Sequence, residues 1–351
     1  MKKAQKILTF LSDNKEKLSP LLILTHNYPD PDAMASAFSL QYLVSDFYGI
    51  ESKIVYGGII GRMENRNMVD ILNIPISKVS QADFKNYPNV ALVDTQPLFQ
   101  NNSFPQDQYA NIVIDQHKST SKPKSELVVI DTKCGATCVI IAEALLLLNA
   151  EIPKNIATAI AYGIVSETLN LYRGTTKRVI NTYLSILPRC DMTALAQIQN
   201  PTRSKNFFKT LGVGIQNAVV CERFIASNLG LVENPDLVSQ TADFFLTYND
   251  IEWSLCTGRY KDNLHISLRS RQEDATAGEF LREVIGDESR AGGHGGIAGG
   301  NIHIGKDSNE NKWKEAEQMI FQGLSEKLHI KSESCSYFPF KTIIEEKKEK
   351  V

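Results

Sequence analysis

Three side chains that bind metal ions lie close together near the N-terminus. His26, Asp30 and Asp32 supply one imidazole and two carboxylates within seven residues. Nitrogen and oxygen ligands in this mixture suit divalent cations such as manganese, magnesium or zinc. The stretch that contains them is therefore a candidate metal site.

Two prolines govern the backbone of this stretch. Pro29 and Pro31 lack backbone N–H groups and fix φ, so we expect the two aspartates between and after them to lie on a stiff, extended segment. Residues 33–42 are predicted to form a helix that begins with small side chains. A helix N-terminus behind a metal cluster also favours phosphate.

Short parallel strands are the elements that must position these side chains. Residues 21–24 are a brief apolar run just before His26, and runs of the same kind, 90–93 and 111–114, end at further acids. Parallel strands deliver their C-terminal residues to one edge of a sheet. We therefore expect one crevice that outlines a two-metal site and contains His26, Asp30, Asp32, Asp94, Asp115 and His117.

The same residues resemble the motifs of the DHH phosphoesterase family. His26-xx-Pro-Asp30-x-Asp32-Ala-xx-Ser36, Val93-Asp94-Thr-Gln96 and Asp115-Gln116-His117 follow the family order, the third standing in place of Asp-His-His. Residues 163–168 stand where the family has an Asp-Thr pair. Residues 292–300 resemble the glycine-rich substrate loop of the C-terminal DHH-associated domain. Over residues 25–300 the chain is thus similar to the branch of oligoribonucleases and small-nucleotide phosphatases.

The resemblance implies an α/β fold with two domains and an active-site cleft between them. The N-terminal DHH domain carries a parallel sheet, and a smaller α/β domain binds substrate. The expected boundaries are a catalytic domain over 1–190, a helical linker over 191–222, a substrate-binding domain over 223–335 and a charged tail over 336–351. A chain of 351 residues is long enough for two such cores. Strands are predicted at 244–248, 253–259 and 263–269, and helices at 275–285 and 313–328.

A set of metal ligands is also implied by the resemblance, and we expect two Mn²⁺ per chain. The positions that match the family ligands are His26, Asp30, Asp32, Asp94, Gln116 and Glu167. Asp94 would bridge the two ions, and Gln116 and Glu167 replace a histidine and an aspartate at the second. An amide oxygen binds transition metals less strongly than an imidazole does, so Gln116 should weaken the second site and tilt it toward magnesium or calcium.

The remaining polar residues of the motifs receive roles from the same resemblance. Alongside Asp94, His117 would face the substrate phosphate and assist protonation of the leaving oxygen, and Asp115 would orient a neighbouring ligand. Consecutive glycine N–H groups can form a concavity that binds anions. The expected substrate contacts are Arg66, Arg269, Gly292, Gly293, His294 and Gly295. For Arg66 a solvated helix start is an equal alternative.

These features predict a metal-dependent hydrolase of short nucleotides. The substrate classes are nano-oligoribonucleotides, linear dinucleotides and 3′-phosphoadenosine 5′-phosphate. A pyrophosphatase or exopolyphosphatase is an alternative, which the glycine-rich loop disfavours. A non-catalytic nucleotide-binding protein with a decayed centre is the contrasting class. The resemblance suggests a homodimer.

Composition excludes other classes. The formal net charge of −2 argues against a globally basic nucleic-acid binder, and we expect no long duplex partner. No apolar run reaches the ~7–15 residues of a signal sequence or the ~18 of a membrane span, so we expect a cytoplasmic protein without a membrane partner. The six cysteines are scattered and are expected to be reduced thiols.

Overall fold

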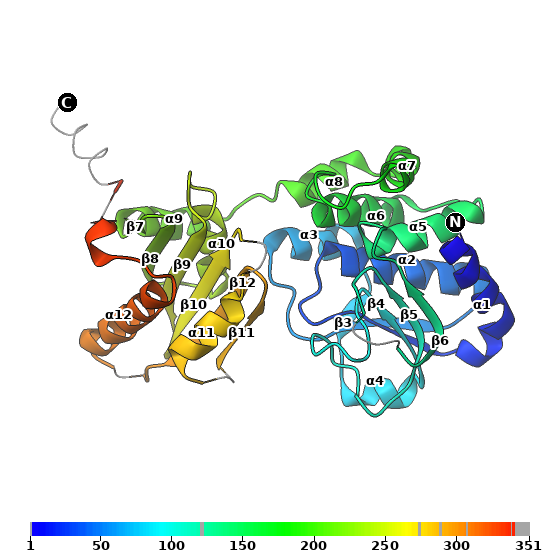
Figure 1. Ribbon diagram of the computed structural model, residues 1–351, viewed down its shortest axis with the longest axis horizontal. Helices are drawn as coiled ribbons and strands as arrows, with labels where there is room; N and C mark the ends of the chain where they lie inside the picture. Colours follow the sequence, from blue (N-terminus) through cyan, green and yellow to red (C-terminus); the bar gives the residue numbers. More distant parts are fainter. Residues whose placement is uncertain are drawn as a thin grey trace. The chain divides into compact units, whose positions relative to one another are not determined.

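The computed structural model describes residues 2–119, 123–272, 275–287, 290–306, 308–337 and 339–340. The chain splits into two compact units, Met1–Pro201 and Thr202–Val351 (Figure 1). The boundary falls inside the stretch that was expected to be a helical linker. No helix of the described ranges is both long enough and apolar enough to cross a bilayer.

The first unit is built on a six-stranded sheet in which every pairing is parallel. The strand order is β3-β2-β1-β4-β5-β6, so the order reverses between β1 and β4. Helices connect β1 to β2, β2 to β3 and β3 to β4, whereas the described residues between β4 and β5 and between β5 and β6 contain no helix. The elements are α1 (Lys2–Leu18), β1 (Leu21–Leu24), α2 (Pro31–Tyr48), β2 (Ser52–Tyr56), α3 (Met63–Leu72), β3 (Ile76–Lys78), α4 (Gln81–Asn86), β4 (Asn89–Val93), β5 (Ala110–Asp115), β6 (Ser125–Ile130), α5 (Thr137–Leu147), α6 (Lys154–Glu167), α7 (Lys177–Ile186), η1 (Leu187–Arg189) and α8 (Met192–Gln199).

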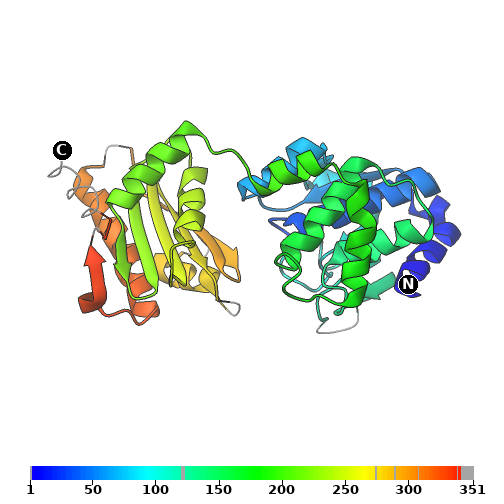
Figure 2. The same ribbon diagram turned by 90° about the horizontal axis from the view of Figure 1, so that it is seen from above.

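Both faces of the central strands β1, β4 and β5 are buried, which explains why these strands are largely apolar. Ile23 and Val93 point to the larger core with α1, α2, α5 and α6. Leu22 and Leu92 point the other way, to a smaller core with α4 and Phe104. Figure 2 looks onto the helices of the larger side. The predicted parallel α/β domain is confirmed.

The start of α2 differs from the sequence expectation. Asp30 is the N-cap, in extended conformation, and its side chain accepts a hydrogen bond from the Ala33 N–H. Pro31 is the first helical residue, a position that proline favours because its missing N–H would have no partner there. Asp32 therefore lies in the first turn of the helix and not on an extended segment.

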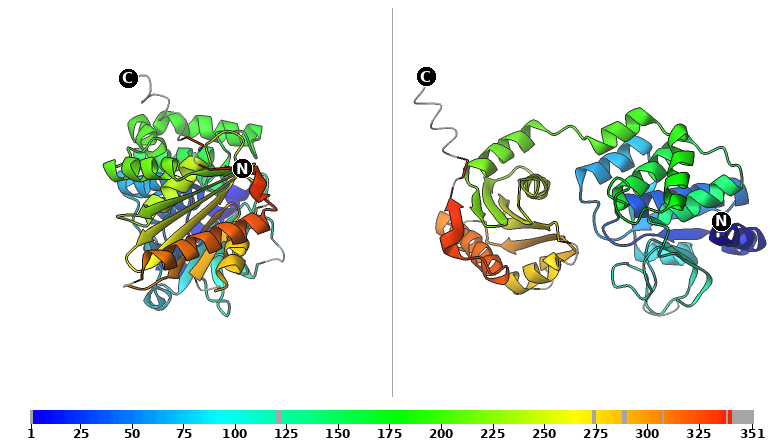
Figure 3. Two further views of the ribbon diagram at one scale, coloured as in Figure 1. Left: turned by 90° about the vertical axis from the view of Figure 1, so that its left-hand side faces the viewer. Right: turned by 45° about the horizontal axis from the view of Figure 1, so that its top comes forward.

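The second unit contains a seven-stranded mixed sheet in the order β11-β12-β10-β9-β8-β7-β13, in which only β8 and β9 pair in parallel. Helices α11 and α12 pack on one face and α9 and α10 on the other (Figure 3). Its elements are α9 (Lys205–Gln216), β7 (Val219–Cys221), β8 (Phe224–Leu231), α10 (Asp236–Phe245), β9 (Trp253–Tyr260), β10 (Asn263–Ser270), α11 (Ala277–Ile285), β11 (Ala291–His294), β12 (Ile297–His303), α12 (Glu310–Lys327), η3 (Ser332–Ser334) and β13 (Cys335–Tyr337).

Two predicted elements of this unit take another form. Residues 244–248 were expected to be a strand, but α10 runs to Phe245 because its Val238, Ala242 and Phe245 pack on the sheet at helical spacing. The glycine-rich residues 292–300 are not an open loop. They form a hairpin in which Gly292 pairs with Gly299 and Gly293 with Ala298.

The expectation that all cysteines are reduced is wrong for one pair. Cys221 on β7 and Cys335 on β13 form a disulfide across a separation of 114 residues. The two residues face each other in the strand register, which the sequence alone does not reveal. The other four thiols are free. From β13 onward most of the expected charged tail lies outside the described residues.

A buried ion-pair network fixes α7 on the first unit. The Arg178 guanidinium donates from Nε and Nη2 to both carboxylate oxygens of Glu143, at 2.5 and 2.7 Å, and from Nη1 to Asp131 at 2.5 Å. Both acids are less than a tenth exposed. Burial raises the pKa of Asp131, but the hydrogen bonds from Arg178 and Lys3 outweigh it and hold that pKa below its usual value.

Replacing Arg178 with methionine should destabilise the first unit by about 3–5 kcal/mol, because the buried carboxylates of Glu143 and Asp131 lose the guanidinium that donates to both. Native-state hydrogen exchange of α5 amides reports this unit alone. Since the folded pKa of Asp131 lies below the unfolded one, its contribution is present above about pH 4 and disappears as the pH falls through the folded value. An equal effect from Arg189→Met, an exposed control, would contradict this account.

Candidate metal centre

The polar cluster lies where the strand order of the parallel sheet reverses. β1 and β4 are neighbours, and their C-terminal ends lead directly to His26 and Asp94. Ligand sites in open α/β sheets form at such a switch point, because the connections leave the edge in opposite directions. The two residues meet there, with the His26 Nε2 atom 3.5 Å from Asp94 Oδ2.

A three-residue ligand set forms around this pair. The His26 Nε2 atom is also 3.8 Å from Asp30 Oδ1, and His26, Asp30 and Asp94 each offer one ligand atom within 4.8 Å of the others. The Nδ1 atom of His26 lies 2.9 Å from the carbonyl oxygen of Asn27. With the ring proton donated to that carbonyl, the Nε2 lone pair faces the carboxylates and is available to a metal ion.

Asp94 reaches the site through an unusual backbone conformation. Its φ is +58°, in the left-handed region, immediately after β4 ends at Val93. Non-glycine residues rarely adopt this conformation, and when they do they cluster at functional sites. The Asp94 N–H donates to the Ile114 carbonyl at 2.9 Å, which holds the turn in place.

Asp32 is not part of this set and caps another helix. Its carboxylate accepts hydrogen bonds from the N–H groups of Thr137 and Cys138, at 2.6 and 2.8 Å. These are the first N–H groups of α5, whose own N-cap residue, Ala136, has no side-chain acceptor. A carboxylate at a helix N-terminus is stabilised both by the hydrogen bonds and by the helix dipole.

Thr137 joins the two acids to Gln116. Its hydroxyl donates to Asp94 Oδ1 at 2.7 Å and accepts from the Gln116 N–H at 3.1 Å. The Gln116 side chain donates from Nε2 to Asp32 Oδ2 at 3.2 Å. Sequence reasoning missed Thr137, although a threonine at the start of an apolar helix was a signal that could have found it.

A second ligand set shares Asp94. Asp94, Asp115 and His117 also offer ligand atoms within 4.8 Å of one another. Within this set His117 Nδ1 lies 2.8 Å from Asp115 Oδ1, and Gln96 donates to the other Asp115 oxygen at 2.6 Å. The His117 side chain is half exposed while Asp115 is fully buried, so the pair presents one imidazole to the solvent side of the site.

The charges of the cluster disturb one another strongly. Burial and the negative charges of Asp30 and Asp94 raise the pKa of Glu167 to about 7. Burial, together with Asp94, Asp30 and Glu167, raises the pKa of Asp32 well above its usual value. Burial also raises the pKa of Asp94. Carboxylates that resist ionisation side by side are the environment in which a divalent cation relieves repulsion.

The pKa values of the two histidines are raised as well, which for an imidazole favours the charged form. Burial lowers the pKa of His26, but hydrogen bonds to Asp30 and Asp94 outweigh it and raise that pKa well above its usual value. The hydrogen bond to Asp115 raises the pKa of His117 to about 9. One imidazole nitrogen and several carboxylate oxygens fit a divalent ion of intermediate hardness, so the residues present suit Mn²⁺ at His26, Asp30 and Asp94.

Close helix packing brings Glu167 to this site. A Cβ on Gly163 would lie 2.9 Å from Ala35 Cβ and 3.1 Å from the Pro31 carbonyl oxygen, so only glycine lets α6 pack this closely on α2. Glu167 ends α6 one turn later, and its Oε1 is 3.6 Å from Arg173 Nη2. It is not part of either compact ligand set. Arg66 lies in α3, partly exposed.

The substrate contacts expected in the second unit lie around the glycine hairpin. Arg269 on β10 is buried, donates from Nε to Asp243 at 2.6 Å and from Nη1 to the Ala298 carbonyl of β12 at 2.9 Å. Gly292 and Gly293 are on β11, and Gly295 begins the turn with a φ of +52°. His294 ends β11, and its side chain lies outside the described part of the structure.

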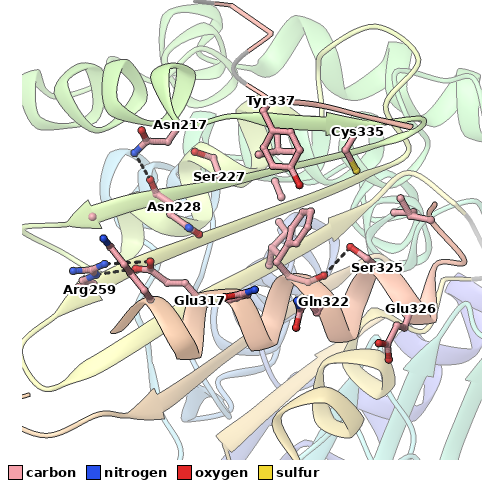
Figure 4. A pocket seen from close by; sticks show the side chains of 18 of the residues that line it. Asn217, Ser227, Asn228, Arg259, Glu317, Gln322, Ser325, Glu326, Cys335 and Tyr337 are labelled. Carbon is pink, nitrogen blue, oxygen red and sulfur yellow. Dashed lines mark hydrogen bonds and ion pairs between the residues drawn. The ribbon is translucent and has the colours of Figure 1, made fainter. Parts of the chain in front are cut away.

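The second unit also contains a cavity of about 1070 Å³ between α12 and strands β7 to β9. Arg259 at one end is paired with Glu317 and Glu310, and Tyr337 of β13 lines the cavity across from α12 (Figure 4). None of the residues that the sequence predicts for a site lines it. The cavity is therefore separate from the metal chemistry described above.

Comparison with known proteins identifies the first unit. Residues 20–164 match the model of the DHH family, N-terminal domain. The chain carries a DHH domain. This span contains both compact ligand sets and ends within α6. The C-terminal DHH-associated branch and the Asp-Gln-His variant of the third motif remain predictions.

Two curated relatives match parts of the chain. An uncharacterized protein of Methanocaldococcus jannaschii is 34% identical over 293 residues, which cover 83% of this chain and 59% of that protein. A probable manganese-dependent inorganic pyrophosphatase of Streptococcus pyogenes is 25% identical over 161 residues, 45% of this chain and 51% of that protein. The chain thus spans little more than half the length of these curated relatives.

A solved structure shares the fold of both units. An exopolyphosphatase-related protein from Bacteroides fragilis aligns with a TM-score of 0.63 over 91% of this chain and 96% of that chain, at 15% sequence identity. At this identity the likeness concerns the fold alone. It agrees with the arrangement of a DHH domain followed by a mixed-sheet unit.

Adding Mn²⁺ to metal-free protein should raise the melting temperature of the DHH domain, because the ion binds only where folding brings the three ligands together. At an Mn²⁺ concentration of 100 times the Kd the stabilisation is about 2.7 kcal/mol. Differential scanning calorimetry measures it. Asp94→Asn should abolish most of the increase, whereas Asp107→Asn, on an exposed loop, should retain it. An equal increase in both variants would show that the ion binds elsewhere.

Proposed function

We propose that this protein is a divalent-metal-dependent hydrolase that cleaves phosphoester bonds in short nucleotides. The observation that carries the proposal is the ligand set of His26, Asp30 and Asp94 beside the hydrogen-bonded pair of Asp115 and His117. The substrate classes are nano-oligoribonucleotides, linear dinucleotides and 3′-phosphoadenosine 5′-phosphate. The proposed cofactor is Mn²⁺, in keeping with the manganese-dependent relative, with a second ion held more weakly.

The chain's own residues divide the work between binding and proton transfer. A bound divalent ion would lower the pKa of an attacking water and neutralise phosphoryl charge. His117, whose pKa the hydrogen bond to Asp115 raises to about 9 in the metal-free chain, would stabilise a phosphoryl oxygen or give a proton to the leaving oxygen. Asp115 holds the ring orientation, and Gln96 in turn fixes Asp115.

Electrostatics favours a short substrate over a long strand. The chain has 38 basic and 40 acidic residues, so no overall positive field attracts a polyanion. A dinucleotide carries few charges, which a metal site and a few donors can neutralise. In the second unit we propose the hairpin at residues 292–295 as a phosphate contact, with Arg269 holding the hairpin through the Ala298 carbonyl.

Hydrolysis of inorganic pyrophosphate or polyphosphate is the second candidate. It is favoured by the similarity to the probable manganese-dependent inorganic pyrophosphatase of Streptococcus pyogenes. That match covers 45% of this chain, so more than half of the chain has no counterpart in it. A nucleotide-binding protein without turnover is the third candidate.

The deciding experiment measures mononucleotide released from 5′-phosphorylated diadenylate with Mn²⁺, Mg²⁺ or Co²⁺. Asp94→Asn should reduce kcat/KM by more than about 100-fold, since loss of a residue that merely orients a ligand costs about 10–100-fold. Asp107→Asn should remain active. Turnover of pyrophosphate and not of the dinucleotide would favour the second candidate. Dinucleotide binding without turnover in any metal would favour the third.

The role of His117 predicts the pH dependence of the reaction. Because the acid form is required, kcat/KM should decline as the pH rises through the pKa of His117, which is about 9 in the metal-free chain. Asp115→Asn removes the acceptor that raises this pKa, so the alkaline decline should move to lower pH. A pH profile with the same alkaline limb in both proteins would remove His117 from proton transfer.

A further inference from the structure

Gln116 stands where the family pattern has a metal-binding histidine, but its side chain does not act as an acceptor there. The Nε2 group donates to Asp32 Oδ2 at 3.2 Å. Its backbone N–H is held by Thr137 Oγ1 at 3.1 Å, which restrains the start of the side chain. At the second metal position, Gln116 therefore presents an N–H donor and not an oxygen ligand.

The carboxylate of Asp32 has no acceptor site left over. Oδ2 accepts from the Thr137 N–H at 2.6 Å and from Gln116 Nε2, and Oδ1 accepts from the Cys138 N–H at 2.8 Å and the Ser36 hydroxyl at 3.4 Å. An ionised carboxylate offers about four lone-pair sites. Four donors occupy them, so a cation at Asp32 must first displace one.

Gln116 is the donor that can leave. Two of the four donors are backbone groups in the first turn of α5, and Ser36 lies on the same helix as Asp32, four residues later. The Gln116 amide is the remaining donor and is attached by a flexible side chain. Its orientation is dictated by its surroundings, because an amide oxygen turned toward Asp32 would face another acceptor.

The Asp94 oxygen nearest Thr137, Oδ1, also accepts a hydrogen bond. Thr137 Oγ1 donates to Asp94 Oδ1 at 2.7 Å, whereas Asp94 Oδ2 faces His26. Neither compact ligand set includes Asp32 or Glu167. The two metal positions are thus unequal: at the first, Asp30 and Asp94 face the His26 imidazole, whereas at the second, Asp32 and Asp94 Oδ1 accept from N–H and O–H donors of the chain itself.

We infer that the Gln116 amide N–H substitutes for the second cation and opposes its binding, so that the chain holds one divalent ion tightly and a second one only when Gln116 swings away. This deepens the proposed function and rests on its first metal position. It reverses the expected role of Gln116, which then competes with the second ion and is not its ligand. The two roles make opposite predictions for removal of the amide.

The test is a titration of metal-free full-length protein with Mn²⁺ alone, without nucleotide. Electron paramagnetic resonance counts free Mn²⁺ and detects spin coupling between two neighbouring bound ions. Wild-type protein should bind one ion per chain at least about tenfold more tightly than the second. In Gln116→Met, which keeps the length of the side chain but removes the amide, the second ion should bind about tenfold more tightly than in wild type.

A second variant supplies a ligand in place of the donor. Gln116→His should bind two ions per chain with affinities within about tenfold of each other and give a spin-coupled signal. The matched controls are Gln106→Met and Gln106→His, at an exposed position, and both should bind as wild type does. These controls separate the effect of position 116 from adventitious binding to a new side chain.

Two outcomes would overturn the inference. Weaker binding of the second ion by Gln116→Met would show that Gln116 is a ligand, and equal affinity for two ions in the wild type would show that nothing opposes the second. Failure of the proposed function looks different. A chain that titrates as expected but hydrolyses none of the nucleotides would lack the activity and still hold the metal as inferred.

Discussion

One buried carboxylate, Asp32, holds the elements of the site together. It lies in the first turn of α2 and accepts the first two N–H groups of α5, a helix that lacks a capping side chain of its own. This contact spans about a hundred residues of sequence. Because it fixes the start of α5, it also places Thr137 against Asp94 and beside Gln116. The relative positions of three motifs therefore depend on a single hydrogen-bonded anion.

The second constraint is electrostatic. The end of a parallel sheet at its switch point collects side chains from several strands, and here most of them are acids. Asp32 and Asp94 are almost fully buried, which raises the pKa of both, and the negative charge of Asp30 raises both further. Such an arrangement costs stability in the absence of a cation, which is typical of sites where function conflicts with folding. The left-handed φ of Asp94 also costs stability, and such conformations are concentrated at functional sites.

The chain's own hydrogen-bond donors offset part of this repulsion, and they do so unevenly. Near Asp32 the donors are backbone N–H groups and the Gln116 amide, whereas Asp30 Oδ1 and Asp94 Oδ2 face the His26 imidazole. A DHH domain can therefore retain its fold and its carboxylates while changing how a second ion is held. In the second unit the buried cation Arg269 has a structural role, because it joins β10 to α10 through Asp243 and to β12 through the Ala298 carbonyl.

The sequence by itself determined the parallel α/β domain and which strand ends carry the acids, because short apolar runs that stop at polar turns are local signals. It also indicated His26 and Asp30 as candidate ligands, near neighbours in the chain, and the structure brings both to Asp94. The donors that oppose the second ion were decided only by the tertiary structure. The contact of Thr137 with Asp94, the amide of Gln116 against Asp32 and the pairing of Cys221 with Cys335 join residues far apart in sequence. Such contacts depend on how helices and strands pack, and residue type and spacing do not record that packing.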